Sequence, residues 1–291
     1  MKMCLVVALS CAAVLAATTD GAPDVNTSGY LDVLGSKIYY EQAGAGSAIV
    51  FLHDGLLPST TWDEVWEPLA SKHEVIRYDR RGYERSELPT KPYSSTEDLR
   101  KVLTHLKVQH AVLVGSSSGG ALAIDFAIEH PEMVDGLFLI GPVLHGMEFT
   151  EQFRERARRN NEPMEHDDVK AWATNWAQDK FLIGGANEKA RRKVYEQLVK
   201  NAATLKKFDN ALEEKLSPPA RQRLSEIKAP TLILIGDADI NDVHAHCEAI
   251  NTGIRGSDRV VIKGSGHLIQ LEKPDEVIKR LEEFIDRLPR R

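Results

Sequence analysis

The stretch that most constrains this chain is 110–130, HAVLVGSSSGGALAIDFAIEH. Residues 111–114 are apolar and rich in valine, which is typical of a strand buried on both faces of a parallel sheet. Gly115 then opens a turn, and residues 121–128 have the alanine and bulky apolar spacing of a helix. The stretch therefore predicts a strand, a tight G-x-S-x-G turn and a helix, with Ser117 at the corner.

The turn itself favours a catalytic role for Ser117. A serine on so sharp a corner has a strained backbone, and neighbours with Cβ atoms would clash with the adjoining strand and helix. The following helix directs its N–H groups toward a group bound at Ser117, so the N–H of Ser118 can donate to an oxyanion. An ordinary strand-to-helix turn is the alternative for such a motif on its own. Partner residues further along the chain favour the catalytic interpretation.

The size and charge of the chain limit the class of protein. With 291 residues, of which 42% are hydrophobic and 27% charged, it can bury one large core, and a single domain with an insertion is the economical interpretation. The formal net charge is −6 and the sequence has no dense stripe of lysine and arginine, which argues against nucleic acid as a partner. The basic residues of 154–159 are interleaved with glutamate and are interpreted as a solvated helix face.

Residues 1–20 have the pattern of a secretory signal peptide, with a basic residue, the apolar run 3–17 and a polar stretch. We expect cleavage near Ala16 or Ala17 and a secreted or periplasmic mature protein. The run is too short for a stable membrane span, which needs about 18 apolar residues or more. A lipoprotein anchored at Cys11 is the less favoured alternative, because the residues before it match that signal poorly. Cys247 then remains as the one cysteine of the mature chain, so no intrachain disulfide can form.

Strand and helix patterns alternate through most of the chain. Two alternating runs, 30–34 and 37–42, predict an antiparallel hairpin at a sheet edge, and apolar strands separated by helical patterns follow. This rhythm stops in the middle of the chain, where aromatic and apolar residues recur at helical intervals. We therefore expect a doubly wound, mostly parallel α/β sheet with a helical cap. The expected parts are 29–146 as the first part of the core, 147–225 as the cap and 226–291 as the second part of the core.

Five motifs lie in an order that resembles one family. They are HDG at 53–55, D-x-R-G-x-x-x-S at 79–86, GSSSGG at 115–120, LILIGDAD at 232–239 and GSGHLIQLEKP at 264–274. In this order they resemble the α/β-hydrolases of the small capped serine esterase, lactonase and C–C hydrolase type. The resemblance extends over nearly all of the chain after the expected signal peptide, and it implies an eight-stranded sheet. Within the second motif, Asp79 and Arg81 are expected to hold loops together.

The resemblance implies a catalytic triad in the chain order serine, acid, histidine, which Ser117, Asp239 and His267 follow. A serine hydroxyl is a poor nucleophile at neutral pH, so a neutral imidazole has to accept its proton during attack and return it to the leaving group. A carboxylate on the far ring nitrogen fixes the tautomer and supports the imidazolium. Asp237 and Asp242 are close enough in sequence to compete for the role of the acid.

The expected oxyanion hole consists of the backbone N–H groups of Gly55 and Ser118. The chain departs from the family beside it, since relatives usually have glycine where Asp54 stands. A carboxylate aimed at a developing oxyanion would repel it, so we expect the Asp54 side chain to turn away and to cap the next helix or bond the loop. Glu84 is a second departure from a usual glycine, and it leaves the shape of the loop over the pocket open.

A cap would form the roof of the substrate pocket, and about half of its aromatic residues should face the substrate. His244 and His246, with Asp242, have a spacing that suggests a metal, but histidines at i and i+2 point to different faces of a helix and no cysteine or glutamate completes a site. We therefore expect no metal and no cofactor. The candidate pocket residues are His53, Asp54, Trp172, Trp176, Phe181 and Leu268.

These features predict a serine hydrolase that cleaves small or medium carboxylic esters or lactones through an acyl-enzyme on Ser117. The partner would be the small-molecule substrate, and the sequence assigns no oligomeric state. Serine at this turn argues against epoxide hydrolase and dehalogenase chemistry, for which the family uses aspartate. The same triad leaves C–C bond hydrolysis of diketones, amide cleavage and cofactor-free perhydrolysis open. An alternative of another class is a non-catalytic protein that binds a small ligand in a hydrolase fold.

Overall fold

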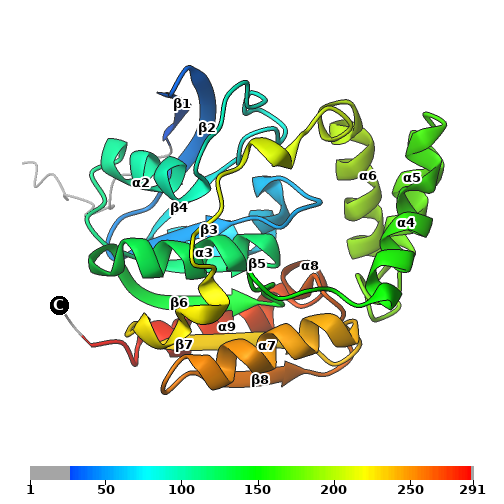
Figure 1. Ribbon diagram of the computed structural model, residues 1–291. Coiled ribbons are helices and arrows are strands. Elements are labelled where there is room, and N and C mark those ends of the chain that lie inside the picture. The colour runs from blue at the N-terminus through cyan, green and yellow to red at the C-terminus, as the bar shows by residue number, and fades with distance from the viewer. Residues whose placement is uncertain (1–26, 290–291) are drawn as a thin grey trace, which may run out of the picture.

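The computed structural model describes residues 27–289. The expected signal peptide at 1–20 and the alternative lipid anchor at Cys11 lie outside these residues. An eight-stranded sheet with the order β1-β2-β4-β3-β5-β6-β7-β8 forms the centre of the described part (Figure 1). The predicted α/β sheet of eight strands is therefore confirmed.

The sheet is mostly parallel. β1 and β2 form the hairpin predicted at the sheet edge, and β2 also pairs antiparallel with β4. The remaining pairs are parallel. Every residue of β3, β5 and β7 is buried, as is typical of strands covered on both faces. The strands are β1 (Thr27–Val33), β2 (Ser36–Ala43), β3 (Ala48–Leu52), β4 (Glu74–Tyr78), β5 (Ala111–Ser116), β6 (Val134–Ile140), β7 (Thr231–Gly236) and β8 (Asp258–Ile262).

Helices cover both faces of this sheet. One face packs against α2, α3 and α7, whose buried residues include Leu99, Phe126 and Val243. The opposite face packs against α1 and α9, for example through Leu69 and Leu281. Two covered faces are the defining feature of a doubly wound α/β architecture. These helices are α1 (Asp63–Ala70), α2 (Ser95–His105), α3 (Ser118–Glu129), α7 (Asn241–Gly253) and α9 (Pro274–Ile285).

Short helical turns connect the longer elements. The most relevant one to the site is α8 (Ile269–Glu272), which starts two residues after His267. A helix of one turn is too short to show a hydrophobic period, so sequence periodicity does not predict it. The other turns are η1 (Ser59–Trp62), η2 (Pro131–Met133), η3 (Asn210–Leu212), η4 (Ala220–Gln222) and η5 (Leu224–Glu226).

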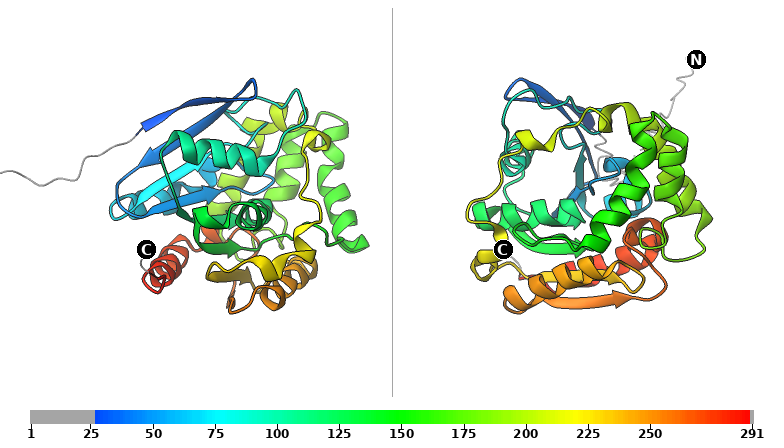
Figure 2. Two further views of the ribbon diagram at one scale, coloured as in Figure 1. Left: turned by 60° about the vertical axis from the view of Figure 1, so that its left-hand side comes forward. Right: turned by 45° about the vertical axis from the view of Figure 1, so that its right-hand side comes forward.

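Three helices form a separate group beside the sheet, as Figures 1 and 2 show. They are α4 (Glu151–Glu165), α5 (Val169–Ala177) and α6 (Glu188–Leu205), and α5 packs against both of the others. Their apolar side chains form a third cluster, distinct from the two clusters on the sheet. Leu57 and Leu268, which belong to loops of the sheet domain, join this cluster and connect the helical group to the rest of the molecule.

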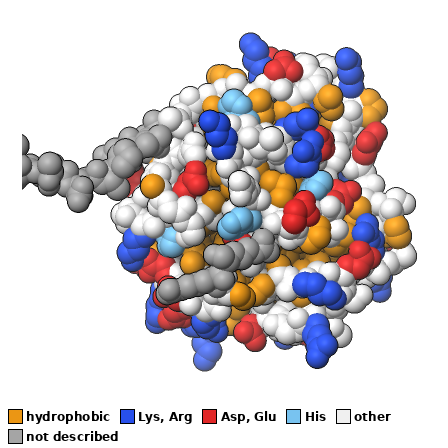
Figure 3. All heavy atoms as spheres, turned by 90° about the vertical axis from the view of Figure 1, so that its left-hand side faces the viewer, with side chains coloured by type: hydrophobic (Ala, Val, Ile, Leu, Met, Phe, Trp, Pro, Cys, Tyr) orange, Lys and Arg blue, Asp and Glu red, His pale blue; other side chains and the backbone are white. Residues whose placement is uncertain are grey.

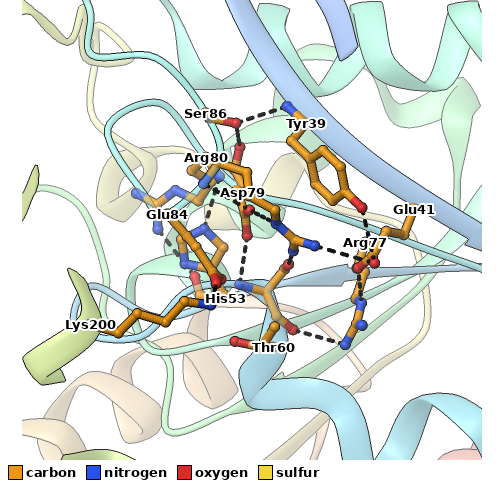
Figure 4. Close-up of polar contacts among 12 residues, drawn as sticks. Tyr39, Glu41, His53, Thr60, Arg77, Asp79, Arg80, Glu84, Ser86 and Lys200 are labelled. Carbon is orange, nitrogen blue, oxygen red and sulfur yellow. Dashed lines mark hydrogen bonds and ion pairs between the residues drawn. The ribbon is translucent and has the colours of Figure 1, made fainter. Parts of the chain in front are cut away.

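One polar face of α6 also contacts the start of α1, the turn η1 before it and the loop that follows β4. Four of its side chains, spaced at three or four residues, make these contacts because residues at this spacing share a helix face. Figure 4 shows the last of these contacts. The pairs are Lys189 with Glu64 (Nζ to Oε2, 2.6 Å), Lys193 with Asp63 (Nζ to Oδ2, 3.2 Å), Gln197 with Thr60 (Nε2 to Oγ1, 3.1 Å) and Lys200 with Glu84.

The stretch 154–159 is not a fully solvated helix face, because one of its arginines points inward. Arg156 is 7% exposed, and its guanidinium donates two hydrogen bonds to the Asp179 carboxylate, at 2.8 and 3.1 Å. Burial raises the pKa of Asp179, but the hydrogen bonds and charge of Arg156 outweigh burial and lower the pKa overall. The same carboxylate accepts the N–H groups of Phe181 and Leu182. The Arg156–Asp179 pair therefore fixes the course of the chain after α5.

Arg156→Met is expected to lower the free energy of unfolding by about 3–5 kcal/mol, because it leaves the buried Asp179 carboxylate without its counter-charge. Urea-induced unfolding at pH 7 measures this loss. The matched control is Arg158→Met, since Arg158 is exposed and pairs with the exposed Glu151. Its loss should be at most about 1 kcal/mol. Equal losses in the two variants would show that the buried pair contributes no more than a surface pair.

The outer surface of the described residues carries charges of both signs. On the face shown in Figure 3, basic and acidic side chains are interspersed, with hydrophobic side chains between them. Among residues 27–289, no helix is both long and apolar enough to cross a membrane.

Candidate active site

Ser117 occupies the corner between β5 and α3, at the C-terminal edge of the sheet. Its φ is +52° and its ψ is −116°, a conformation that side-chain-bearing residues rarely adopt. The next turn of chain passes so close to β3 that a Cβ on Gly119 would lie 2.2 Å from the Leu52 carbonyl oxygen. A Cβ on Gly115 would lie 2.5 Å from the Gly119 carbonyl oxygen. The glycines of the motif thus permit the corner that presents the Ser117 side chain.

His267 and Asp239 form a hydrogen-bonded pair at the same edge. Asp239 follows β7, His267 follows β8, and the Nδ1 atom of His267 lies 2.7 Å from Oδ2 of Asp239. The other Asp239 oxygen accepts the backbone N–H of Ile240 at 2.7 Å. Burial lowers the pKa of His267, but the charge of Asp239 and its hydrogen bond outweigh burial, so the pKa is raised overall. The pair can therefore hold a proton on His267 more firmly than a free imidazole would.

The two competing aspartates have other partners. Asp237 accepts the backbone N–H groups of Gly264 and Ser265, at 2.7 and 3.3 Å. Asp242 accepts the N–H and the hydroxyl of Thr150, at 2.6 and 2.9 Å. Both carboxylates thus stabilise loops, and Asp239 is the one of the three that contacts His267.

Gly141 lies beside the His267–Asp239 pair, although no sequence motif points to it. The Ser117 N–H donates to Ile140 at 2.9 Å, which places the end of β6 beside the corner. Gly141 has a φ of +48°, and a Cβ there would be 3.0 Å from His267 Nδ1 and 3.3 Å from Asp239 Oδ2. Ser117 thus contacts the last residue of β6, and the His267–Asp239 pair lies beside the next residue, so the end of β6 relates the three predicted triad residues. Among residues 27–289, Ser117 Oγ has no hydrogen-bond partner, and such contacts often form only when substrate binds.

Gly55 and Ser118 face each other next to this corner. A Cβ on Gly55 would lie 3.3 Å from the Ser118 hydroxyl. Neither residue's backbone N–H donates to an acceptor within the described range, and Ser118 is the first residue of α3, where helix N–H groups have no partner inside the helix. Tyr83 donates to the Gly55 carbonyl oxygen at 2.9 Å and supports this loop. The two N–H groups are thus available for a ligand oxygen.

Asp54 turns toward its own loop, as expected. Its Oδ1 atom accepts the N–H groups of Leu56 and Leu57, at 2.7 and 2.9 Å. Its Oδ2 atom is buried without a hydrogen-bond partner in the described residues. Burial raises the pKa of the Asp54 carboxyl, although the two N–H groups and the nearby His267 oppose this rise. The carboxylate consequently acts on His267 through its charge.

Asp54→Asn is expected to move the acid limb of the pH profile of kcat/KM to lower pH. The Asp54 charge is one of the groups that raise the pKa of His267, and asparagine keeps the loop acceptor while removing that charge. Since the base has to be neutral to accept a proton, a lower pKa preserves activity further into acid. Hydrolysis rates measured across pH test this shift. Asp32→Asn, which alters an exposed turn, is the control, and an unmoved or raised acid limb in Asp54→Asn contradicts the prediction.

His53 is a buried structural histidine, although it was expected in the pocket. Its Nε2 atom accepts the backbone N–H of Arg80 at 2.9 Å, so Nδ1 carries the proton and donates to the Asp54 carbonyl oxygen at 2.8 Å. Burial, followed by the charge of Arg80, lowers the pKa of His53 to about 3. A neutral ring with both nitrogens engaged has no atom left for a substrate.

The loop that contains Asp79 is held by a dense set of polar contacts, shown in Figure 4. Asp79 accepts the Ser59 N–H at 3.0 Å and the Arg85 guanidinium at 2.7 Å. Arg81 donates to both oxygens of Asp98, at 2.6 and 2.8 Å. Asp79 and Arg81 therefore have the structural roles expected of them.

The two tryptophans of α5 do not line the cavity of about 600 Å³ that opens next to Gly55 and Ser118. Trp172 and Trp176 are 4% and 6% exposed in the cap's own apolar cluster, and both indole N–H groups donate to Asn161. Leu268 is buried in the same cluster. Phe181 contributes its backbone, because its carbonyl oxygen accepts the N–H of His267 at 2.9 Å. These four residues pack or position other groups, and contact between them and a substrate stays a prediction.

A cavity of about 600 Å³ opens next to Gly55 and Ser118. It lies between α3, the first turn of α2 and the segment 208–217, which runs past α3 after α6 (Figure 1). Arg80 and Tyr83 also line it. The sequence motifs do not reveal this cavity, because the segment 208–217 has no pattern that places it over α3.

No group of metal-binding side chains occurs among residues 27–289. His246 is buried on α7, where its Nδ1 atom accepts the N–H of Leu144 at 2.9 Å and its ring stacks on Phe149. Cys247 is a buried free thiol, and burial raises its pKa. A raised pKa keeps a thiol protonated and unreactive.

Comparisons with known proteins agree with this geometry. The family model described as "Alpha/beta hydrolase family" matches residues 49–280. The 2-hydroxy-6-oxo-6-phenylhexa-2,4-dienoate hydrolase of Comamonas testosteroni is 27% identical over 271 residues, which cover 85% of this chain and 91% of that protein. The uncharacterized hydrolase YraK of Bacillus subtilis is 32% identical over 145 residues, so the match spans 46% of this chain and about half, 54%, of YraK.

A solved structure described as an N-acyl homoserine lactone degrading enzyme has a TM-score of 0.70 and 27% identity, and the match covers 88% of this chain and 100% of that one. With the fold and the family match, these findings define the class. The chain belongs to the alpha/beta hydrolase family.

Proposed function

We propose that this protein is a serine hydrolase that cleaves small or medium carboxylic esters or lactones. The observation that carries the proposal is the 2.7 Å hydrogen bond between Asp239 and His267, next to a serine held in a strained corner. Such a triad acts on carbonyl compounds with a leaving group, and one fold serves many such substrates. The lactone-degrading structural relative supports the choice of ester and lactone bonds.

In this mechanism His267 accepts the proton of the Ser117 hydroxyl while the oxygen attacks the carbonyl carbon. The N–H groups of Gly55 and Ser118 donate to the oxyanion that develops. His267 then returns the proton to the leaving alkoxide, which departs and leaves an acyl group on Ser117. Water, deprotonated by His267, attacks the acyl carbon, and His267 then gives that proton to the departing Ser117 oxygen. The acid is released and the enzyme regains its starting state.

The test is hydrolysis of a chain-length series of 4-nitrophenyl esters by the mature protein. A serine-reactive phosphonate, with mass mapping of the adduct, reports the nucleophile independently of the substrate. We expect ester turnover and an adduct on Ser117. Turnover without an adduct on Ser117 contradicts the mechanism, and the absence of both favours a protein that binds a small ligand without converting it.

C–C bond hydrolysis is the second candidate, because a relative named as a phenylhexadienoate hydrolase matches 85% of the chain. An adduct on Ser117 without ester or lactone turnover would favour it. We also propose that the mature protein is secreted or periplasmic, and that 147–225 is the cap between the core parts 29–146 and 226–291. Mass analysis of the protein recovered from its host tests the export, because cleavage near Ala16 removes a defined mass.

A further inference from the structure

Arg80 stands apart from the other arginines around it. Arg77, Arg81 and Arg85 each form an ion pair with a carboxylate, at 2.6, 2.6 and 2.7 Å. The Arg80 guanidinium has two neutral acceptors instead, the Ser118 hydroxyl at 2.8 Å and the His53 carbonyl oxygen at 3.2 Å, and both bond to Nη1. Among residues 27–289, its Nε atom is buried without any acceptor.

A guanidinium without a counter-charge is costly to keep away from water. Glu213 is the acidic residue whose charge raises the pKa of Arg80, but its carboxylate is bonded by Lys215 and by the Ser95 hydroxyl. Burial raises the pKa of Glu213, and the charge of Arg80 opposes this rise more than the hydrogen bond from Lys215 does, but among residues 27–289 no carboxylate is bonded directly to the Arg80 guanidinium. The inner end of the cavity consequently keeps the positive charge of Arg80.

The Arg80 guanidinium lies close to the proposed oxyanion hole. Arg80 lines the cavity of about 600 Å³ together with Gly55 and Ser118, whose N–H groups are proposed to bind the oxyanion. Ser118 connects the two, because its hydroxyl bonds to Arg80 while its N–H belongs to the oxyanion hole. A substrate bound by both groups has to carry an acceptor for the guanidinium a short chain of atoms away from its reacting carbonyl.

We propose that the substrate carries a carboxylate, which the Arg80 guanidinium binds at the inner end of this cavity. The inference rests on the proposed ester hydrolysis and names its substrate class. The planar fork of arginine donates two parallel hydrogen bonds to a carboxylate, and such charge-assisted pairs are strong. The same cavity is also lined by four acidic residues and two further basic ones, so a singly charged group fits it better than a multiply charged anion. They are Asp125, Glu129, Glu213, Glu214, Lys215 and Arg223.

The experiment compares esters that differ only in that charge. Mono-4-nitrophenyl succinate, glutarate and adipate carry a free carboxylate, and their methyl esters are the neutral counterparts. For the best chain length we expect kcat/KM of the free acid to exceed that of its methyl ester about tenfold or more, as a charge-assisted hydrogen bond allows. In Arg80→Met this preference should vanish while the methyl ester is still hydrolysed.

Two further variants separate recognition from folding. Arg80→Lys keeps the charge but not the fork, so the preference should fall partway. Arg100→Met removes an arginine on α2 that pairs with Glu97 outside the cavity, and the preference should remain intact. Circular dichroism and the Tm of each variant show whether it is folded. If Arg80→Met does not fold, the partial loss in Arg80→Lys carries the test.

The outcomes distinguish this inference from the proposed function. Hydrolysis of the methyl esters without a preference for the free acids, or a preference that survives in Arg80→Met, overturns the carboxylate site and leaves the hydrolase standing. If no ester is hydrolysed, the proposed function fails, and calorimetric titration with glutarate decides the site. Glutarate binding that Arg80→Met loses supports the site, and no binding overturns it.

Discussion

Ser117→Ala is expected to reduce kcat for ester hydrolysis on the order of 10⁴-fold or more, because it removes the proposed nucleophile and with it the acyl-enzyme. The fold should persist. Alanine fits the same corner as serine, and the Ser117 side chain has no hydrogen-bond partner among residues 27–289 that its removal would leave unsatisfied. The measurement is the steady-state rate with the best 4-nitrophenyl ester, beside the Tm of the variant.

The control for Ser117→Ala is Ser71→Ala, since Ser71 is an exposed serine whose hydroxyl donates only to the Pro68 carbonyl oxygen. It should retain full activity and full labelling by the phosphonate. Fragmentation of the labelled peptide then has to place the adduct on Ser117 and not on the adjoining Ser116 or Ser118. A Ser117→Ala protein that keeps more than about a tenth of the wild-type rate rules out the proposed nucleophile, given the losses that triad residues usually cause.

Asp239→Asn is expected to lower kcat roughly 10³- to 10⁴-fold with little change in fold. Asparagine can present its N–H₂ group to Nδ1 of His267, which favours the tautomer with the proton on the wrong nitrogen. The imidazolium that forms during attack would also lose the carboxylate that stabilises it. Rates measured at several pH values should show the loss throughout, with an acid limb at lower pH, because Asp239 raises the pKa of His267.

The competing acids are the matched controls for Asp239→Asn. Asp237→Asn and Asp242→Asn retain an oxygen for the backbone N–H groups of Gly264 and Thr150 that each now binds. Their rates should stay within about tenfold of wild type, because neither carboxylate contacts His267. A larger loss in either of them than in Asp239→Asn would reassign the acid of the triad.

Most of the fold could be predicted from the sequence because its strands are long, apolar and separated by amphipathic helices. The strand and the helix predicted at 111–114 and 121–128 differ from expectation only at their ends. The contact between Asp239 and His267 follows from the same logic. Both residues come after parallel strands that are neighbours in the sheet, so their loops meet at one edge.

The sequence did not reveal the roles of some site residues, because these roles are set by tertiary contacts between elements. Trp172 and Trp176 are four residues apart, which places them on one helix face but does not say whether that face meets substrate or another cap helix. Arg80 and Arg81 are adjacent, and only the folded loop shows that one is paired and the other is not. Arg156 has charged neighbours in the sequence, which favours a solvated helix face. Its buried partner Asp179 lies beyond the next helix, so the pair cannot be read from local spacing.

Backbone hydrogen bonds join the segment that follows α5 to the loop that carries His267, and they have a kinetic consequence. Phe181 and Leu182 accept the N–H groups of His267 and Leu268, so this edge of the cap cannot swing away without disturbing the base. α6, by contrast, is held to the rest of the chain by lysine pairs. Salt weakens such pairs. Because salt weakens the α6 pairs and not these backbone hydrogen bonds, ionic strength should change the rate of substrate entry past the proposed cap more than the rate of bond cleavage at the proposed base, His267.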